Sequence, residues 1–247
     1  MKPARAEKKI TSFIRRYFES AGKSTAIVGL SGGLDSAATA ALCVKALGKK
    51  NVLSVLLPSA STPADDLGDA SDFASKLGVR AMEFEIEPVI SSFRGLAAGR
   101  LQRANVSARA RMIILYSLAQ KEGGLVVGTG DKSEFMLGYF TKYGDGGADL
   151  FPIGGLYKTE VRQLALALGV PARIANKPPS PALWLGQTAE SELGFSYEEA
   201  DKVLSAIEKG AAKKQLGRRF GKELAASVLS RIEKNRHKSA PAPVCRV

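Results

Sequence analysis

The segment Ser31–Ser36, with the sequence SGGLDS, gathers residue types that could bind phosphate groups. Its two glycines would let the backbone turn tightly and approach a ligand closely. Ser31 and Ser36 offer hydroxyl donors, and Asp35 could hold the magnesium ion that accompanies phosphates. At the start of a helix, unpaired amides and the helix dipole would also favour an anion. The segment therefore predicts a phosphate-binding loop, and the alternative is an Asp35 or Ser36 that merely caps a helix.

The elements around this segment alternate between strand and helix patterns. Apolar runs typical of buried strands lie at residues 25–29, 52–57, 80–86 and 125–128. Helical patterns lie at residues 10–18, 36–47, 63–77 and 100–121, and two more, at 197–207 and 220–232, predict extra C-terminal helices. The alternation predicts an α/β fold, with a doubly wound, mainly parallel sheet and helices on both faces. Ligands in such sheets bind beyond the carboxyl ends of the strands, where Ser31–Ser36 lies.

The composition describes a chain that can bury a full core and that carries excess positive charge. Its 247 residues are 45% hydrophobic, which fits one main α/β domain. Lysine and arginine number 36 against 24 aspartate and glutamate residues, which gives a formal net charge of +12. A surface of that sign should attract polyanions such as nucleotides, nucleic acid or acidic lipid head groups.

The chemistry available from cysteine and histidine is limited. Cys43 and Cys245 are far apart and lack CxxC spacing, which excludes a disulfide framework and a thiolate zinc site. The single histidine, His237, has no positioned serine or cysteine partner, so no nucleophilic triad is expected. The start of the chain has no uninterrupted apolar region, and no later segment approaches the roughly 18 apolar residues of a membrane span. We therefore expect a cytoplasmic protein without a membrane partner.

Two segments carry a resemblance to a known family. The SGGLDS segment resembles the SGGxDS pyrophosphate loop of the N-type ATP pyrophosphatases, which cleave ATP between the α and β phosphates and adenylate a substrate. The segment 128–165 is rich in glycine, charge and aromatic residues, as site-lining segments often are. It resembles the NAD synthetases, above all in Phe140–Gly147 (FTKYGDGG) and the following Asp149. The resemblance extends from the loop to the C-terminal tail.

This resemblance implies a fold and an activity. The fold would be adenine-nucleotide α-hydrolase-like, in a single domain at residues 1–247, with an ATP pyrophosphatase core at about 24–175 and C-terminal helices and a tail at about 196–247. The activity would be that of an ammonia-dependent NAD synthetase, a ligase that forms a carbon–nitrogen bond. It would adenylate the nicotinate carboxylate of deamido-NAD with ATP, and ammonia would then displace AMP, giving NAD, AMP and pyrophosphate.

The resemblance also implies an ATP site and a metal site. Catalytic roles would fall to Asp35, Glu134 and Lys158, and Asp35 and Glu134 would hold Mg²⁺, which prefers oxygen ligands. The implied ATP-binding residues are Gly29, Leu30, Ser31, Gly32, Gly33, Leu34, Asp35, Ser36, Thr129, Lys158 and Ser180. From the residues alone, Glu134 could instead be a carboxylate that the dipole favours at a helix N-terminus, and Lys158 an ordinary solvated lysine.

For deamido-NAD, the resemblance implies contacts from an arginine before residue 112, from residues within the segment 128–165 and from two residues of the C-terminal tail. The implied residues are Arg109, Lys142, Asp149, His237 and Lys238. Arg109 and Arg111 flank Ala110 and point in different directions on a helix, so only one needs to face the site. The resemblance implies Arg109. The alternative for His237 is a solvated side chain in a basic tail.

The ammonia source and the partners follow from the same resemblance. The predicted loop starts within the first three dozen residues, which leaves no room before it for a glutaminase domain. We therefore expect free ammonia, or ammonia from a separate glutaminase partner, as the nitrogen donor. The resemblance also implies a homodimer, with deamido-NAD near the subunit boundary.

Two departures from the family pattern keep other functions open. Ala182 stands where the family usually has aspartate, and Ala189 stands where an acidic residue is usual. One alternative is a tRNA-modifying ATP pyrophosphatase, although the paired cysteines of thiolating members are absent and no RNA-binding domain is evident. A second is a non-catalytic nucleotide-binding or nucleic-acid-binding protein. Nucleic acid is not the expected partner.

Overall fold

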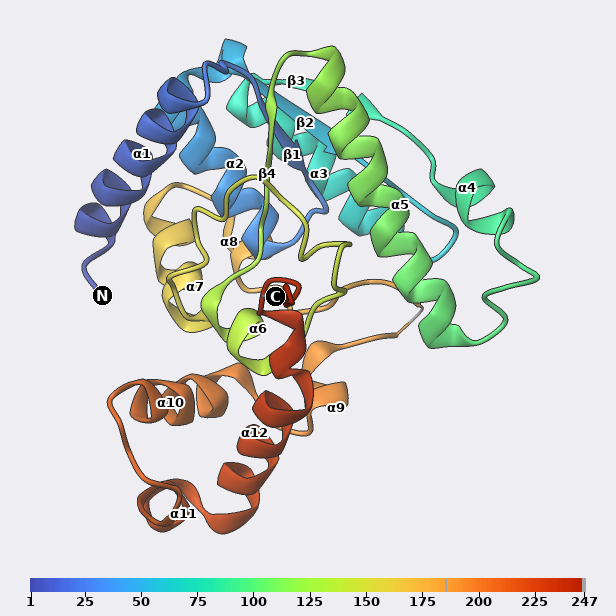
Figure 1. Cartoon of the computed structure of the whole chain (residues 1–247). Helices are drawn as coiled ribbons and strands as arrows, with labels where there is room; N and C mark the ends of the chain where they lie inside the picture. Colours follow the sequence, from blue (N-terminus) through green and yellow to red (C-terminus); the bar gives the residue numbers. More distant parts are fainter. Residues whose placement is uncertain (185, 246–247) are drawn as a thin grey trace.

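The structure is a computed structural model that describes residues 1–184 and 186–245 of the chain. Its described residues form a four-stranded parallel sheet in the order β3-β2-β1-β4 (Figure 1). The strands are β1 (Ala26–Gly29), β2 (Val52–Leu56), β3 (Arg80–Glu83) and β4 (Leu125–Val127). In the register, Ala26 of β1 lies opposite Val52 of β2 and Leu125 of β4. The predicted parallel sheet is confirmed.

Helices cover both faces of the sheet because successive strand residues point to opposite sides. Ala26 and Val28 pack into one hydrophobic cluster, whereas Ile27 between them packs into another. The first cluster contains side chains of α1 (Pro3–Ser20), α2 (Leu34–Leu47), α3 (Ala64–Leu77), α7 (Lys158–Ala167) and α8 (Ala172–Ala175). The second contains side chains of α4 (Glu87–Ser91) and α5 (Arg100–Lys121). A sheet with apolar residues on both faces is the doubly wound arrangement that the sequence predicted.

The strand order creates a crevice beside the predicted phosphate loop. From β1 the chain passes through α2, a short 3₁₀ helix (Lys49–Asn51) and β2 to β3, and it then returns through α5 to β4 on the other side of β1. The direction of winding therefore reverses between β1 and β4. Parallel sheets bind ligands at such a switch point, beyond the carboxyl ends of the strands. Residues 30–33 lie there, between β1 and α2.

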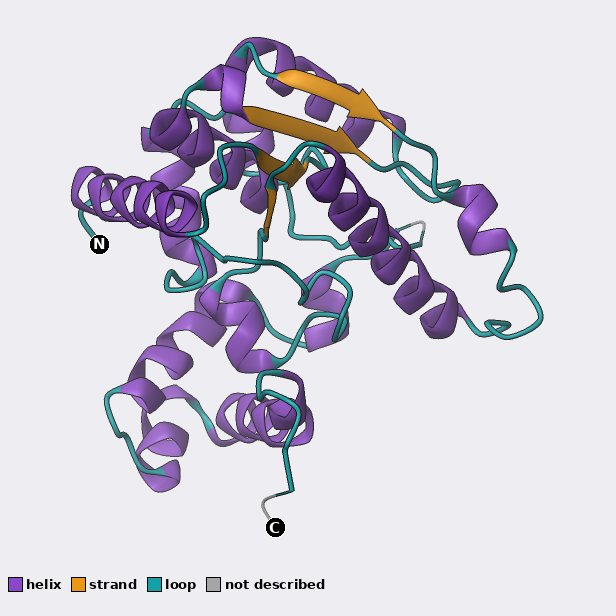
Figure 2. Cartoon of the chain, turned by 45° about the horizontal axis from the view of Figure 1, so that its top comes forward, coloured by secondary structure: helices purple, strands orange, loops and turns teal. Residues whose placement is uncertain are grey.

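A third hydrophobic cluster joins α6 to the C-terminal helices. Its helices are α6 (Lys132–Leu137), α9 (Ala189–Leu193), α10 (Tyr197–Glu208), α11 (Lys213–Phe220) and α12 (Lys222–Asn235), and a short 3₁₀ helix (Arg236–Lys238) follows. These helices form the lower part of the molecule in Figures 1 and 2, below the sheet. The described helices include none that is both long enough and apolar enough to cross a membrane. Because α6 belongs to this cluster, the C-terminal helices can position residues of α6.

Some predicted element boundaries were wrong. The third strand ends at Glu83 rather than Ile86, and all four of its residues are exposed at one edge of the sheet. The predicted helix at 220–232 begins at Lys222, since Gly221 with φ +91° interrupts the helical backbone. The helix before that glycine, α11, was not predicted as a separate element, because Leu216 and Phe220 are the only large apolar residues of its sequence KKQLGRRF.

Candidate active site

A cavity of about 750 Å³ lies at the carboxyl ends of the strands. The loop after β1, the residues after β4, the first residue of α7 and the segment 177–184 all contribute to its lining. Every predicted ATP-binding residue except Gly32 lines it, and so does Glu134. The structure therefore brings together residues from four separate stretches of the chain, as the resemblance implied.

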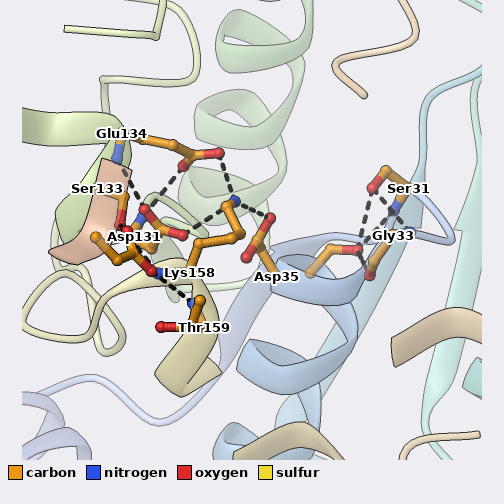
Figure 3. A network of polar contacts seen from close by, with 10 residues as sticks. Ser31, Gly33, Asp35, Asp131, Ser133, Glu134, Lys158 and Thr159 are labelled. Atoms are coloured by element: carbon orange, nitrogen blue, oxygen red, sulfur yellow. Dashed lines mark hydrogen bonds and ion pairs between the residues drawn. The ribbon is translucent and has the colours of Figure 1, made fainter. Parts of the chain in front are cut away.

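The loop Ser31–Gly33 is held in a tight turn by its own hydroxyl groups. The Ser31 amide donates to Ser36 Oγ at 3.2 Å, and Ser36 Oγ donates to the Gly33 carbonyl at 3.0 Å (Figure 3). Gly32 has φ +77°, and a Cβ atom there would lie 2.1 Å from the Asp66 carbonyl oxygen, so only glycine fits. Gly33 precedes α2 without any side-chain cap, which leaves the first amides of α2 available to an anion.

Lys158 lies at the centre of the polar network in this site. Its Nζ atom is 2.7 Å from Asp35 Oδ2, 2.8 Å from Glu134 Oε1 and 3.0 Å from Asp131 Oδ2, and its side chain is 1% exposed (Figure 3). Burial disfavours the ammonium, but the three carboxylates outweigh this and raise the pKa of Lys158 well above its ordinary value. Lys158 is therefore not a solvated lysine, and these carboxylates explain why a cation stands at the N-terminus of α7.

Asp131 and Glu134 are positioned by a reciprocal cap of α6. The Glu134 amide donates to Asp131 Oδ1 at 2.8 Å, and the Asp131 amide donates to Glu134 Oε2 at 3.2 Å. The other oxygen of each carboxylate faces Lys158. Glu134 is thus a helix-terminal carboxylate and a member of the cluster at once. Asp131 was missed in the sequence, although the spacing Asp-x-x-Glu in DKSE is typical of such a cap.

Asp201 of α10 connects the C-terminal helices to this cluster. Ser133 Oγ donates to Asp201 Oδ1 at 2.5 Å, and the Thr159 amide donates to Asp201 Oδ2 at 2.9 Å. Ser133 Oγ also accepts the Lys158 amide at 2.9 Å. One buried carboxylate therefore fixes the N-termini of both α6 and α7, the two helices that carry Glu134 and Lys158. No local pattern in the sequence signals this role.

The cluster contains more negative than positive groups. Burial raises the pKa values of Glu134 and Asp131, and repulsion among the carboxylates adds to this while Lys158 opposes it. Asp35 Oδ1 is buried and has no hydrogen-bond partner among the described residues. The described residues contain no group of three or more potential ligands arranged around a metal position. Asp35 and Glu134 could still contribute carboxylate oxygens to a cation that also binds phosphates and water.

The segment around Ser180 lines the cavity and is ordered by local bonds. Ser180 Oγ donates to the Gln187 carbonyl at 2.6 Å and accepts the Ala182 amide at 3.0 Å. Ala182, which departs from the family pattern, adopts φ +48°. Ala189, the second departure, is 2% exposed and packs in the C-terminal hydrophobic cluster. An acidic side chain is therefore replaced there by apolar packing.

The residues predicted to bind deamido-NAD fall into three places. Arg109 Nη2 donates to the Lys142 carbonyl at 3.3 Å, and Lys142 Nζ donates to the His237 carbonyl at 3.0 Å, so these three residues meet outside the cavity lining. Lys238 lines the cavity, and its Nζ donates to the Gly138 carbonyl at 2.8 Å. Asp149 lies elsewhere, where its Oδ2 accepts the Val126 amide at 2.7 Å.

Arg111 lines the cavity and Arg109 does not, although the resemblance implied Arg109. Arg111 Nε donates to the Leu57 carbonyl at 3.0 Å, and burial lowers the pKa of its guanidinium to about 10. The helical argument that only one of the two arginines faces the cavity is correct. The sequence could not reveal which arginine faces the cavity, because both lie next to small residues. These residues, Ala108 and Ala110, are both buried.

The parallel sheet, the glycine loop at its switch point and the buried lysine–carboxylate cluster define an α/β enzyme of the nucleotide-binding class. A family model described as NAD synthase matches residues 6–242. The NH(3)-dependent NAD(+) synthetase of Methanosarcina acetivorans is 46% identical over 97% of each chain. The chain therefore belongs to the NAD synthase family, as the sequence predicted, and the tRNA-modifying alternative is set aside.

Solved structures agree with this assignment. The NMN synthetase from Francisella tularensis superimposes with a TM-score of 0.88 at 30% identity, and each chain is covered completely. The NH3-dependent NAD synthetase from Campylobacter jejuni gives a TM-score of 0.86 at 31% identity, again with complete coverage of both chains. The predicted fold class is confirmed.

Proposed function

We propose that this protein is an ammonia-dependent NAD synthetase, which uses ATP to convert deamido-NAD and ammonia to NAD, AMP and pyrophosphate. One observation carries the proposal: the SGGLDS loop and the Lys158 cluster line the same cavity of about 750 Å³. Cavities that bind small molecules are commonly about 300–1,000 Å³. Membership of the NAD synthase family and the 46% identity to an NH(3)-dependent NAD(+) synthetase support the same activity.

The residues of the cavity suit an adenylation reaction. The amides at the start of α2 and the hydroxyl of Ser31 would hold the β and γ phosphates of ATP. The nicotinate carboxylate would attack the α-phosphorus, and the bond to pyrophosphate would break. Lys158, fixed by three carboxylates, would stand beside the departing negative charge. Ammonia would then attack the acyl carbon and release AMP, a step that needs positioning more than a strong base.

Asp35 and Glu134 fit the Mg²⁺ that the family implies. Both are carboxylates, the ligand type that this hard cation prefers, and Asp35 Oδ1 is buried without a hydrogen-bond partner in the described part of the chain. Mg²⁺ bound there would neutralise charge on the phosphate oxygens of ATP. The excess of carboxylates over lysine in the cluster gives that cation an electrostatic reason to bind.

For the second substrate, we keep Arg109, Lys142, Asp149, His237 and Lys238 as the proposed contacts. The contacts that join Arg109, Lys142 and His237 support a common binding surface for three of them. The homodimer also stays a proposal. It is supported by Ile113 of α5, which lies in the apolar run 112–118 and is 59% exposed. A molar mass measured in solution tests it.

Ammonia is the proposed nitrogen donor and the cytoplasm the proposed location. Cys43 is a buried free thiol whose pKa burial raises to about 12, so it is not a glutaminase nucleophile. Cys245 is exposed and free, which agrees with a reducing compartment. Addition of glutamine in place of ammonium should give no turnover until a separate glutaminase is supplied.

The experiment that tests this function is a direct assay. Purified protein is incubated with ATP, Mg²⁺, ammonium and deamido-NAD, and NAD and AMP are measured. The Asp35→Ala variant is the control, because it removes one carboxylate of the cluster and leaves the loop glycines in place. Equal product from the wild type and this variant, or none from a folded wild type that binds ATP, would overturn the proposal. Nicotinate mononucleotide serves as the comparison substrate, since a solved neighbour is an NMN synthetase.

A further inference from the structure

Lys177 contacts the predicted pyrophosphate loop from outside it. It follows α8, and its Nζ lies 2.6 Å from Asp66 Oδ1, 2.7 Å from Asp69 Oδ2 and 3.3 Å from the Gly32 carbonyl. An ammonium has three N–H donors, so these three acceptors account for all of them. Burial disfavours the charge, but the hydrogen bonds to both aspartates outweigh it and raise the pKa of Lys177. The residue is therefore an ammonium at neutral pH.

The loop rests directly on the N-terminal turn of α3. A Cβ atom at Gly32 would lie 2.1 Å from the carbonyl oxygen of Asp66, so the two backbones are in close contact. Asp66 also supplies the carboxylate that binds Lys177. Lys177 thus joins the two sides of this contact, the Gly32 carbonyl on the loop and the Asp66 side chain on α3.

The remaining side-chain hydrogen bonds of the loop are internal. Those of Ser31 and Gly33 run to each other or to Ser36. Apart from these bonds of Ser36, the bond from Lys177 to the Gly32 carbonyl is the only side-chain hydrogen bond that reaches residues 31–34 within the part of the chain that the structure describes. The position of the loop relative to α3 therefore depends on Lys177 more than on any other side chain.

We propose that Lys177 is a positioning residue, which holds the Ser31–Gly33 loop against α3 so that the first amides of α2 face the pyrophosphate of ATP. This role rests on the proposed synthetase function. Lys177 does not act on the reacting atoms, because its three hydrogens are already donated to protein oxygens. It acts through the backbone of Gly32, and its loss should weaken ATP binding more than the chemical step.

Arg173 provides a matched control. Like Lys177, it belongs to the region of α8 and binds α3, with Nε 2.5 Å from Asp69 Oδ1 and Nη2 2.9 Å from Asp72 Oδ2. It makes no hydrogen bond to the loop in the described structure, and its side chain is 57% exposed. If substitution only loosens the packing of α8 against α3, variants of both residues should weaken ATP binding. If it disturbs the position of the loop, only the Lys177 variant should do so.

The test compares Lys177→Met, Lys177→Arg and Arg173→Met with the wild type. We measure kcat, the KM for ATP and for deamido-NAD, and the affinity for ADP by calorimetry, together with the thermal midpoint. Lys177→Met should raise the KM for ATP and the Kd for ADP by about tenfold while kcat changes by less than about twofold. Lys177→Arg should recover most of the loss, because arginine keeps the charge and can still reach the aspartates. Arg173→Met should leave both constants near the wild-type values.

Three outcomes would overturn the role. Equal KM values for ATP in Lys177→Met and Arg173→Met, an unchanged Kd for ADP, or a parallel rise in the KM for deamido-NAD would each show a merely structural contribution. Should Lys177→Met not fold, Asp66→Asn provides the second arm, because it removes one negative charge that faces the same ammonium and should raise the KM for ATP about two- to threefold. Absence of turnover in the wild type would instead refute the synthetase function, and ADP affinity would still test the loop.

Discussion

Two lysines that the sequence singled out have opposite environments. Lys158 is 1% exposed, and its ammonium is bound by three carboxylates, one from α2 and two from the N-terminus of α6. Lys142 is half-buried, and its ammonium donates to a single backbone carbonyl, that of His237, and lies 5.3 Å from the centroid of the Tyr143 ring. The resemblance implied a substrate contact for both residues, yet only Lys158 is held in place by buried carboxylates.

The difference indicates how the two halves of the site are built. The nucleotide half is formed by the sheet, the starts of three helices and buried ion pairs. Groups fixed in advance lose little freedom when the substrate arrives. The proposed deamido-NAD half depends on side chains that contact backbone carbonyls of other loops. Such side chains can rearrange around a second substrate at small cost.

Replacing Lys158 should have the largest effect. Lys158→Met removes the ammonium bound to the three carboxylates and deprives them of its counter-charge. Breaking a buried ion pair in this way costs about 3–5 kcal/mol of unfolding free energy. The loss of a fixed charge beside the reacting phosphates should also lower kcat by about 10²-fold or more. Urea denaturation and steady-state assays measure the two effects.

Lys132→Met is the matched control for that variant. Lys132 also forms an ion pair, with Glu208, but that pair lies at the surface. Surface pairs contribute about 0–1 kcal/mol, so stability and kcat should change little. Similar losses of stability in the two lysine variants would contradict the proposed difference between buried and exposed charge.

Replacing Asp201 should have an intermediate effect. Asp201→Asn keeps the shape of the side chain but presents an N–H group to either Ser133 Oγ or the Thr159 amide, which both donate to it in the structure. The unfolding free energy should fall by about 1–3 kcal/mol, because a buried donor loses its acceptor. Because α6 and α7 carry Glu134 and Lys158, kcat should fall as well. Glu198→Gln on the same helix, which breaks an exposed pair with Arg162, should change neither quantity appreciably.

Much of the fold and the nucleotide half could be predicted because their signals are local. The apolar runs of β1 and β2 and the glycines and hydroxyls of the SGGLDS segment lie within short windows of sequence. Asp131 was accessible in the same way, through its spacing to Glu134. Asp201 and Lys177 were not, because they act on partners 68 and 145 residues away in the chain. Only the folded chain brings those residues together.

The arginine pair shows a further limit of the sequence. Helical geometry predicts that Arg109 and Arg111 point in different directions, and the structure agrees. Which of them reaches the cavity depends on the packing of α5 against the sheet, which no pattern within the helix records. The structure places Arg111 against the Leu57 carbonyl and Arg109 against the Lys142 carbonyl. The proposed contact between Arg109 and deamido-NAD stays a prediction.

Replacing Lys142 should have the smallest effect on the fold and a selective effect on binding. Lys142→Ala removes an ammonium with one backbone acceptor, so the unfolding free energy should change by less than about 0.5 kcal/mol. The KM for deamido-NAD should rise about tenfold, as for loss of one charged contact, while the KM for ATP stays unchanged. Lys121→Ala, at the exposed end of α5, is the control and should alter neither KM. A rise in the KM for ATP would contradict the division of the site into two halves, because Lys142 would then act on the nucleotide half as Lys158 does.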